Sequence, residues 1–493
     1  MKKTILYLLI SVNYFNFSFS QEKKATKDLK KDLEIIRDIT LQLSTKLTKE
    51  DKINLNNFFE VKASELKKDS LTIIDFFNFI FDSKINSKFD EHAAFNIPED
   101  VMMPFLKNNT VFPIPIKVIN KKLIVNSKKT SIPYGSIIES INDVNISDLY
   151  KRLMREGEHE TYDYKMFESQ FSLVYLLRIG NPNQFKITYR KSLNDSQILK
   201  TTIDGIKIED YLNVMNNERI YPLHRKELRN QINTNYFTDS NTYYLQFNSF
   251  NWIESETENS YLEFNKLLDS TFNDIKHKKT ENLIIDLRFN SGGNIEIPAL
   301  LYSYIAKSPF IDNVIGKINH FNFPHTEHII AASEVVIDEN NTLPGFIEYI
   351  KQGAEKIGDQ YIIKYIDNKT INPKENAFKG NVYLLIGGNT ISASAYFSSQ
   401  FKLNQRGEII GEQIGGSHHE ITAGYSLEYK LPTSNLTMTI PILVLSLSDE
   451  VYKKVPEKKI TPNVTLSEKT RYNYFIKEED PEIMETLKII NKK

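Results

Sequence analysis

The segment "NVYLLIGGNTISASAYF" (residues 381–397) joins a predicted buried strand to a predicted helix through a pair of glycines. Its first six residues are apolar and rich in branched side chains, which is typical of a buried strand. From Ala393 to Leu403, the apolar residues are spaced for one buried face of a helix. Ser392 therefore stands at the first turn of a helix, where unpaired N–H groups and the helix dipole stabilise negative charge. We interpret Ser392 as a candidate nucleophile; the alternative is that Thr390 or Ser392 only caps the helix.

A second segment has the same form. "NLIIDLRFNSGGN" (residues 282–294) is another apolar run that ends in a polar turn with two glycines. Together with "GEIIGEQIGG" (residues 407–416), and in this order, these blocks resemble the family of C-terminal processing (tail-specific) serine peptidases. That family also includes the tricorn core protease and the non-enzymatic interphotoreceptor retinoid-binding protein. The resemblance is specific over residues 240–465 and looser before them.

The resemblance implies an α/β fold with a crotonase/ClpP-like core, which we place at residues 209–493. The chain supports this expectation, because strand and helix patterns alternate from residue 242, as in right-handed crossover units. Residues 313–375 interrupt the alternation with a polar, charged insertion, either a lid or an extension of the strands. We expect strands at 243–248, 283–287, 381–386, 426–431 and 436–445, and helices at 255–278, 297–306 and 480–490.

Two smaller domains precede the predicted core. Residues 21–108 have apolar positions at three- and four-residue steps and predict a helical domain, with helices over 28–47 and 57–81. Residues 109–208 predict a β-rich domain, in which the segment from Ile132 to Ile146 resembles the turn of a PDZ domain. PDZ domains bind an extended peptide as an added strand, so the domain either binds peptide tails or is purely structural.

The first 20 residues have the pattern of a secretory signal peptide. Lys2 and Lys3 precede a short apolar run, and small residues stand before a cleavage site near Ser20. The chain has no cysteine, which excludes disulfides, a thiol nucleophile and a lipoprotein anchor. The net charge of −1 gives no reason to expect nucleic acid as a partner. We therefore expect an exported, periplasmic protein without a membrane span, whose oligomeric state the sequence does not define.

Acyl transfer needs a nucleophile, a base and donors for the oxyanion. By its position in the family motif, Ser392 is the expected nucleophile, and Ser394 is the competing candidate. The N–H of Ala393 directly follows the nucleophile and is the natural first oxyanion donor. The second donor is expected from the turn with Gly292 and Gly293, where the backbone can approach a substrate carbonyl.

The expected base is less well defined. Tail-specific peptidases pair the serine with a lysine in the loop after "GE", but the matching position here is Ser417. The resemblance to the tricorn-like branch implies instead that His92 is the base and that Glu457 is the late glutamate of that branch. A neutral imidazole suits this task near neutral pH. His418 and His419 lie in the loop that would carry the lysine and are the alternative bases.

No cofactor or metal is expected. His320, His325, His328 and Glu327 lie in the insertion and raise the question of a metal site, but their spacing is loose and more typical of solvated loop residues. The sequence therefore predicts an exported serine endopeptidase whose substrate is a polypeptide. The alternative is a catalytically inert relative that binds peptides or lipophilic ligands.

Overall fold

The computed structural model describes residues 22–45, 47–80, 92–154, 160–220, 232–251, 260–333, 335–447 and 449–492. The predicted signal peptide lies outside these residues, as do Asp90 and Glu91 beside His92. Each helix in the described ranges is too short or too polar to span a membrane.

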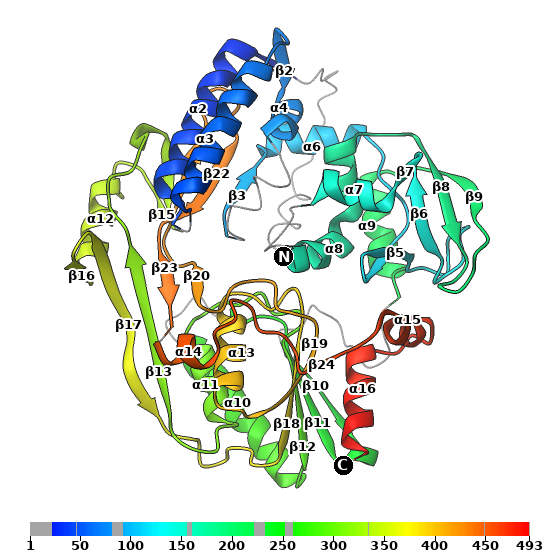
Figure 1. Ribbon diagram of the computed structural model, residues 1–493, viewed down its shortest axis with the longest axis vertical. Coiled ribbons are helices and arrows are strands. Elements are labelled where there is room, and N and C mark those ends of the chain that lie inside the picture. The colour runs from blue at the N-terminus through cyan, green and yellow to red at the C-terminus, as the bar shows by residue number, and fades with distance from the viewer. Residues whose placement is uncertain are drawn as a thin grey trace.

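The core of the molecule is a six-stranded sheet with the order β10-β11-β12-β18-β19-β24, of which all but β10 run parallel (Figure 1). Helices α10, α11 and α13 pack on one face, and α16 packs on the other. The expected α/β fold is thus confirmed. The core elements are β10 (Ile232–Phe237), β11 (Thr242–Phe247), α10 (Ser260–His277), β12 (Asn282–Asp286), α11 (Ile297–Ser303), β18 (Asn381–Ile386), α13 (Ala393–Leu403), β19 (Gly407–Gly411), α14 (Asp449–Lys454), β24 (Val464–Thr465), α15 (Glu468–Ile476) and α16 (Pro481–Ile490).

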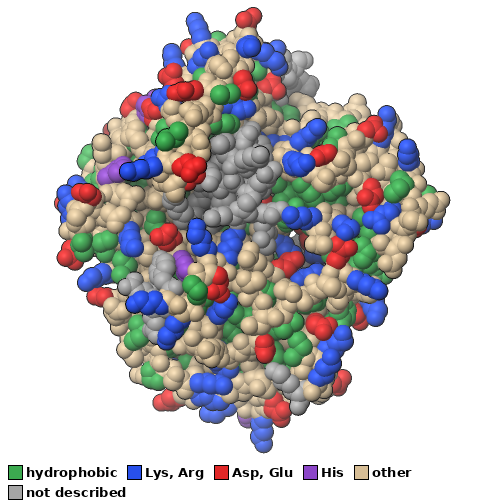
Figure 2. Space-filling view, in the orientation of Figure 1, with side chains coloured by type: hydrophobic (Ala, Val, Ile, Leu, Met, Phe, Trp, Pro, Cys, Tyr) green, Lys and Arg blue, Asp and Glu red, His purple; other side chains and the backbone are tan. Residues whose placement is uncertain are grey.

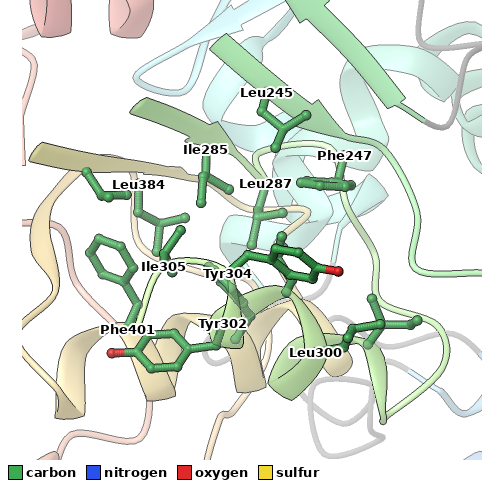
Figure 3. Packing of buried hydrophobic residues seen from close by; sticks show 14 of the residues in the cluster. Leu245, Phe247, Ile285, Leu287, Leu300, Tyr302, Tyr304, Ile305, Leu384 and Phe401 are labelled. Carbon is green, nitrogen blue, oxygen red and sulfur yellow. The ribbon is translucent and has the colours of Figure 1, made fainter. Parts of the chain in front are cut away.

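Both faces of the parallel strands are buried, which explains their continuous apolar sequences. Leu245, Ile285 and Leu384 point toward the helices that carry Tyr302 and Phe401, and all five side chains are inaccessible or nearly so (Figure 3). Alternate residues of the same strands pack against α16 on the opposite face. The sheet is therefore a rigid support for the loops at its carboxyl edge.

The insertion extends the core into two five-stranded sheets, with the orders β16-β17-β13-β23-β20 and β15-β14-β21-β22-β3. The expected strand over residues 436–445 is wrong, because it divides at Ile442 and Leu443 into strands of two different sheets. A continuous apolar run fits one buried strand or two, so its pattern could not show the break. The elements are β13 (Phe310–Ile318), β14 (Ile329–Ala332), β15 (Val335–Val336), α12 (Leu343–Gln352), β16 (Ala354–Ile357), β17 (Gln360–Ile371), β20 (Glu420–Thr422), β21 (Ser426–Lys430), β22 (Thr437–Pro441) and β23 (Val444–Ser446).

The N-terminal helices pack on the sheet that contains β21 and β22. Buried Asp32 of α2 accepts hydrogen bonds from the N–H groups of Thr433 (3.0 Å) and Ser434 (2.7 Å) in the β21–β22 turn. The expected helix over 57–81 is wrong, because β2 interrupts it and pairs with β1. The elements are β1 (Lys23–Ala25), α2 (Thr26–Leu43), α3 (Lys49–Glu65), β2 (Ser70–Thr72), α4 (Ile73–Ile80), β3 (Ala94–Asn96) and α6 (Glu99–Asn108).

A separate antiparallel sheet with the order β4-β5-β6-β8-β9 forms the β-rich domain. Its strand β4 stands at the edge of the sheet and lies against the long helix α8. The elements are β4 (Ile116–Ile119), β5 (Lys122–Val125), β6 (Ile137–Ile141), β7 (Val144–Asn145), α7 (Ile146–Leu153), α8 (Glu160–Ile179), β8 (Gln184–Arg190), β9 (Leu199–Asp204) and α9 (Ile208–Asn217).

The edge of this sheet is already occupied by side chains of α8. Glu168 accepts a hydrogen bond from the N–H of Val118 at 3.2 Å, and Ser172 donates to the carbonyl of Phe112 at 2.7 Å. A peptide tail added as a strand would have to compete with these bonds. On the face shown in Figure 2, acidic and basic side chains are interspersed, so no patch of one charge offers a different docking surface there.

Candidate active site

Three loops meet at the carboxyl edge of the parallel sheet. Strands β12, β18 and β19 are neighbours, with Asp286 opposite Leu385 and Ile386 opposite Gly411. The segments that follow them carry the two glycine-paired turns and the loop after "GE". Because parallel strands end at the same edge, three segments that are far apart in sequence come together there.

Ser392 occupies a strained turn between β18 and α13. Its backbone has φ 55° and ψ −129°, a conformation that glycine adopts readily and that costs other residues about 1–3 kcal/mol. The turn is closed by the hydrogen bond from Ser394 N–H to Ile391 C=O at 3.1 Å. The Ser392 side chain makes no hydrogen bond that caps the helix, so the capping alternative does not explain it. The surrounding structure holds the hydroxyl group at the first turn of the helix.

Thr390 and Ser394 have structural roles instead. The Ser394 hydroxyl group is fully buried and donates to the carbonyl of Asn290 at 2.6 Å. Thr390 donates to the carbonyl of Leu287 at 2.8 Å. Both bonds tie the turn at Ser392 to the segment that follows β12. Because its own hydroxyl group is buried and engaged, Ser394 is a poor competitor as nucleophile.

The turn with Gly292 packs directly on the serine. A Cβ atom at Gly292 would lie 2.7 Å from Ser392 Cβ and 2.9 Å from Ala393 N, so only glycine fits. The N–H of Gly292 donates to Asn290 Oδ1 at 2.8 Å and is therefore engaged. In the described part of the chain, no hydrogen bond is found for the N–H of Gly293 or Ala393. Gly292 thus provides the space for this close approach, and the roles of Gly293 and Ala393 as oxyanion donors stay predictions.

We expect Gly292→Ala to lower kcat/KM about 10²- to 10³-fold, the loss typical of a damaged oxyanion site. The methyl group would displace Ser392 or the Ala393 amide, and φ at position 292 is +97°. Peptide hydrolysis measured with purified protein checks this. Gly358→Ala is the matched control, because φ is +60° there and nothing lies within 4 Å. Normal activity in Gly292→Ala would contradict the close approach of this turn to the nucleophile.

His92 stands two residues before β3, the strand that carries the N-terminal segment to the core. Ala94 of β3 pairs with Thr439 of β22, so His92 lies toward the Pro441 end of that strand. The chain continues from Pro441 into β23, which pairs with β20 directly after the His418 loop. The sheet thus brings the segment with His92 toward the loop after β19. The role of His92 as the base stays a prediction.

His418 and His419 are buried and engaged away from Ser392. His418 contacts Ser399 through Nδ1 and the carbonyl of Glu457 through Nε2 (2.6 Å), and His419 Nε2 contacts the carbonyl of Val455 (2.6 Å). Ser399 follows Ser392 by seven residues, which is roughly 10 Å along the helix. These imidazoles therefore hold the segment around residue 456 in place, and sequence reasoning missed that role.

The predicted role of Glu457 requires its carboxylate near the base and Ser392. The structure instead pairs this carboxylate with Lys402 in the last turn of α13. Lys402 follows Ser392 by ten residues, or roughly 15 Å along the helix. Burial would raise the pKa of Glu457, but the hydrogen bond from Lys402, a backbone hydrogen bond and the charge of Lys402 together lower that pKa. The geometry does not bring Glu457 to the serine.

Acid should weaken the fold through His418. Burial lowers the pKa of this imidazole from about 6.5 in the unfolded chain to about 4. Between these values the unfolded state binds the proton more readily, so stability falls as the pH drops from 6.5 to 4. We expect His418 to account for about 2–3 kcal/mol of the loss between pH 7 and pH 4.5. Urea unfolding of wild type and His418→Gln at both pH values tests this; an equal loss in the two proteins would contradict it.

A buried network of ion pairs fixes two of the three loops, and the sequence analysis did not predict it. Arg288, which precedes the Gly292 turn, pairs with Asp286 (2.6 Å), Asp480 (2.8 Å) and Glu482 (2.7 Å). Arg471 also pairs with Glu482 and donates to the carbonyl of Gly411 at 3.1 Å. Burial would raise the pKa of Glu482, but the two arginines lower it. Helices α15 and α16 thereby clamp the turn after β12 and the end of β19.

Two histidines of the insertion, His325 and His328, lie near each other with ring centroids 6.5 Å apart, but they have different acidic partners. His325 contacts Asp38 of α2 at 3.0 Å, and His328 lies 3.8 Å from Glu327. Within the described residues, no three His, Cys, Asp or Glu side chains form a group that could hold a metal ion.

Comparison with known proteins identifies the core. Residues 241–466 match the model of peptidase family S41. A serine-to-alanine mutant of CPAF has a TM-score of 0.60 and 11% identity, over 92% of this chain and 96% of that chain. Mature CPAF complexed with lactacystin has a TM-score of 0.56 and 13% identity, over 95% and 99%. The photosystem II D1 C-terminal processing protease has a TM-score of 0.40 and 12% identity, over 90% and 94%. No curated protein matches the chain.

The match to this family makes the chain a serine-type peptidase. Its core, residues 241–466, is similar to peptidase family S41, which includes the C-terminal processing peptidases, as the resemblance of the sequence implied.

Proposed function

We propose that the protein is an endopeptidase whose nucleophile is Ser392. The observation that carries this proposal is the strained backbone of Ser392, held against the Gly292 turn at the N-terminus of α13. Strain at a residue whose side chain does not cap the helix needs another reason, and exposure of a nucleophile is the usual one.

In the proposed reaction, the Ser392 hydroxyl group attacks the peptide carbonyl carbon while His92 takes its proton. The N–H groups of Ala393 and Gly293 stabilise the oxyanion. The intermediate then collapses, the C–N bond breaks, and the amine leaves with the proton from the imidazolium. Water, activated by the same imidazole, hydrolyses the acyl-serine ester and restores the enzyme.

The proposal is tested by incubating the purified protein with an unfolded polypeptide and, separately, with a fluorophosphonate. We expect internal cleavage of the polypeptide and a covalent adduct at Ser392, located by peptide mass spectrometry. An adduct at another residue would assign a different nucleophile. If neither cleavage nor an adduct is observed, the inert peptide-binding alternative is favoured. The presence of Ser417 in place of the family's lysine supports that alternative.

We also propose that the protein is exported to the periplasm after cleavage near Ser20. The charged and apolar pattern of residues 2–12 supports this. We expect the mature protein, isolated from the cells that produce it, to begin at Gln21 or close to it. Mass spectrometry of its N-terminal peptide checks this, and a cytoplasmic protein that retains Met1 would contradict it.

A further inference from the structure

A cavity of about 250 Å³ lies where the N-terminal helices, the β-rich domain and strand β3 meet. Its walls come from α4, α7, α8, β3 and β22. The lining is mostly apolar and includes three methionines, Met154, Met166 and Met438. Apolar pockets with few polar groups are the usual form of a binding site.

One face of α8 forms a whole wall of this cavity. Asp163, Met166, Gln170, Val174 and Arg178 recur at three- and four-residue steps and all line it. This stripe spans 16 residues, or roughly 22 Å of helix. The cavity is thus elongated, with a length suited to an extended peptide segment of several residues.

The same helix contacts two loops at the carboxyl edge of the core sheet. Tyr162 lies beside Gly415, because a Cβ atom at Gly415 would be 2.9 Å from Tyr162 Cβ and 1.9 Å from the carbonyl oxygen of Gly388. Lys165 forms an ion pair of 2.6 Å with Glu412. The first two turns of α8 therefore touch the loops around Ser392 and also line the cavity. His92 supplies a second link, since its neighbour Ala93 lines the cavity as well.

The charges and the apolar side chains of the cavity walls indicate which kind of ligand fits. Among the described lining residues, the charged ones are Asp163 and Arg178, of opposite sign at the two ends of the stripe, so neither charge type dominates. Arg178 stacks on Phe77 at 4.6 Å. The methionines supply flexible, polarisable surface that adapts to side chains of different shape. An apolar side chain fits such walls better than an anionic one does.

We propose that this cavity is the subsite that receives large apolar side chains of the polypeptide substrate, with α8 linking it to the catalytic loops. The inference rests on the proposed function for the identity of the ligand. Broad preference for Phe, Leu or Met over small residues follows, because the methionines that line the cavity adapt to side chains of different shape.

The test uses binding, so that it does not depend on catalysis. Two fluorescein-labelled dodecapeptides are compared that carry phenylalanine or alanine at alternate positions. In Ser392→Ala protein, we expect the phenylalanine peptide to bind at least about tenfold more tightly, as a filled apolar pocket provides. Adding Gln170→Trp should fill the cavity and reduce this preference to within about twofold. Ala94→Phe, at an exposed position of the lining, is a second variant with the same expected effect.

Gln352→Trp is the matched control, because Gln352 is exposed at the end of α12, which contributes nothing to the cavity. It should keep the preference of the Ser392→Ala protein. The inference would be overturned if the Ser392→Ala protein showed no preference for the phenylalanine peptide. It would also be overturned if that preference persisted in both cavity variants. Hydrolysis by the protein with native Ser392 is measured separately. Loss of the proposed function would appear there, whereas failure of the cavity proposal would appear only in the binding preference.

Discussion

Ser392→Ala should lower peptide hydrolysis by about four to six orders of magnitude, because removing a serine nucleophile leaves only binding and oxyanion stabilisation. Fluorophosphonate labelling should disappear as well. The unfolding midpoint should barely change, since the Ser392 side chain makes no cap hydrogen bond whose loss would leave a buried partner. Hydrolysis rates, labelling and urea unfolding of the same preparations measure all three effects.

Two matched variants sharpen this result. Ser392→Gly should be equally inactive but more stable by about 1 kcal/mol, because glycine tolerates φ 55° without strain. Ser394→Ala should show the opposite pattern, with activity largely retained and stability reduced by about 1–3 kcal/mol, since the bond to the Asn290 carbonyl is lost. Full hydrolysis by Ser392→Ala would end the assignment of the nucleophile.

His92→Ala should have the second largest effect, a fall of several orders of magnitude in kcat, as expected when a triad base is removed. In the wild-type protein, kcat/KM should fall in acid, because an imidazolium cannot accept the serine proton. The pH–rate profile of wild type and the residual rate of His92→Ala test the same assignment by independent readouts.

His418→Ala is the matched histidine control. It should weaken the fold, because the carbonyl of Glu457 and Ser399 lose their shared partner, while turnover by the remaining folded protein changes little. A normal kcat in His92→Ala, or a selective loss of kcat in folded His418→Ala, would move the base to the loop after β19.

The parts of the site that could be predicted from the sequence are local. A buried strand, two glycines and a helix are encoded within the 17 residues from 381 to 397, and the same holds for the turn at Gly292. The strained backbone of Ser392 and the crowding by Gly292 are consequences of that local pattern.

The parts that could not be predicted depend on long-range contacts. Nothing near Arg288 indicates that its counter-ions come from residues 480 and 482, almost 200 positions later. Glu457 matched a family position, yet its partner is set by how the segment around residue 456 packs on α13. The division of the strand at Ile442 likewise follows from pairing with two different sheets.

The clamp of α15 and α16 on the catalytic loops has a consequence for biosynthesis. Because chains fold from the N-terminus as they are made, Arg288 remains without Asp480 and Glu482 until almost 200 further residues have been synthesised. Burying an arginine without its counter-ions costs free energy, so we expect the turn beside Ser392 to remain unfolded until they are present. We therefore expect the turn beside Ser392 to assemble only after residues 480 and 482 have joined the fold, which would keep partially synthesised chains inactive.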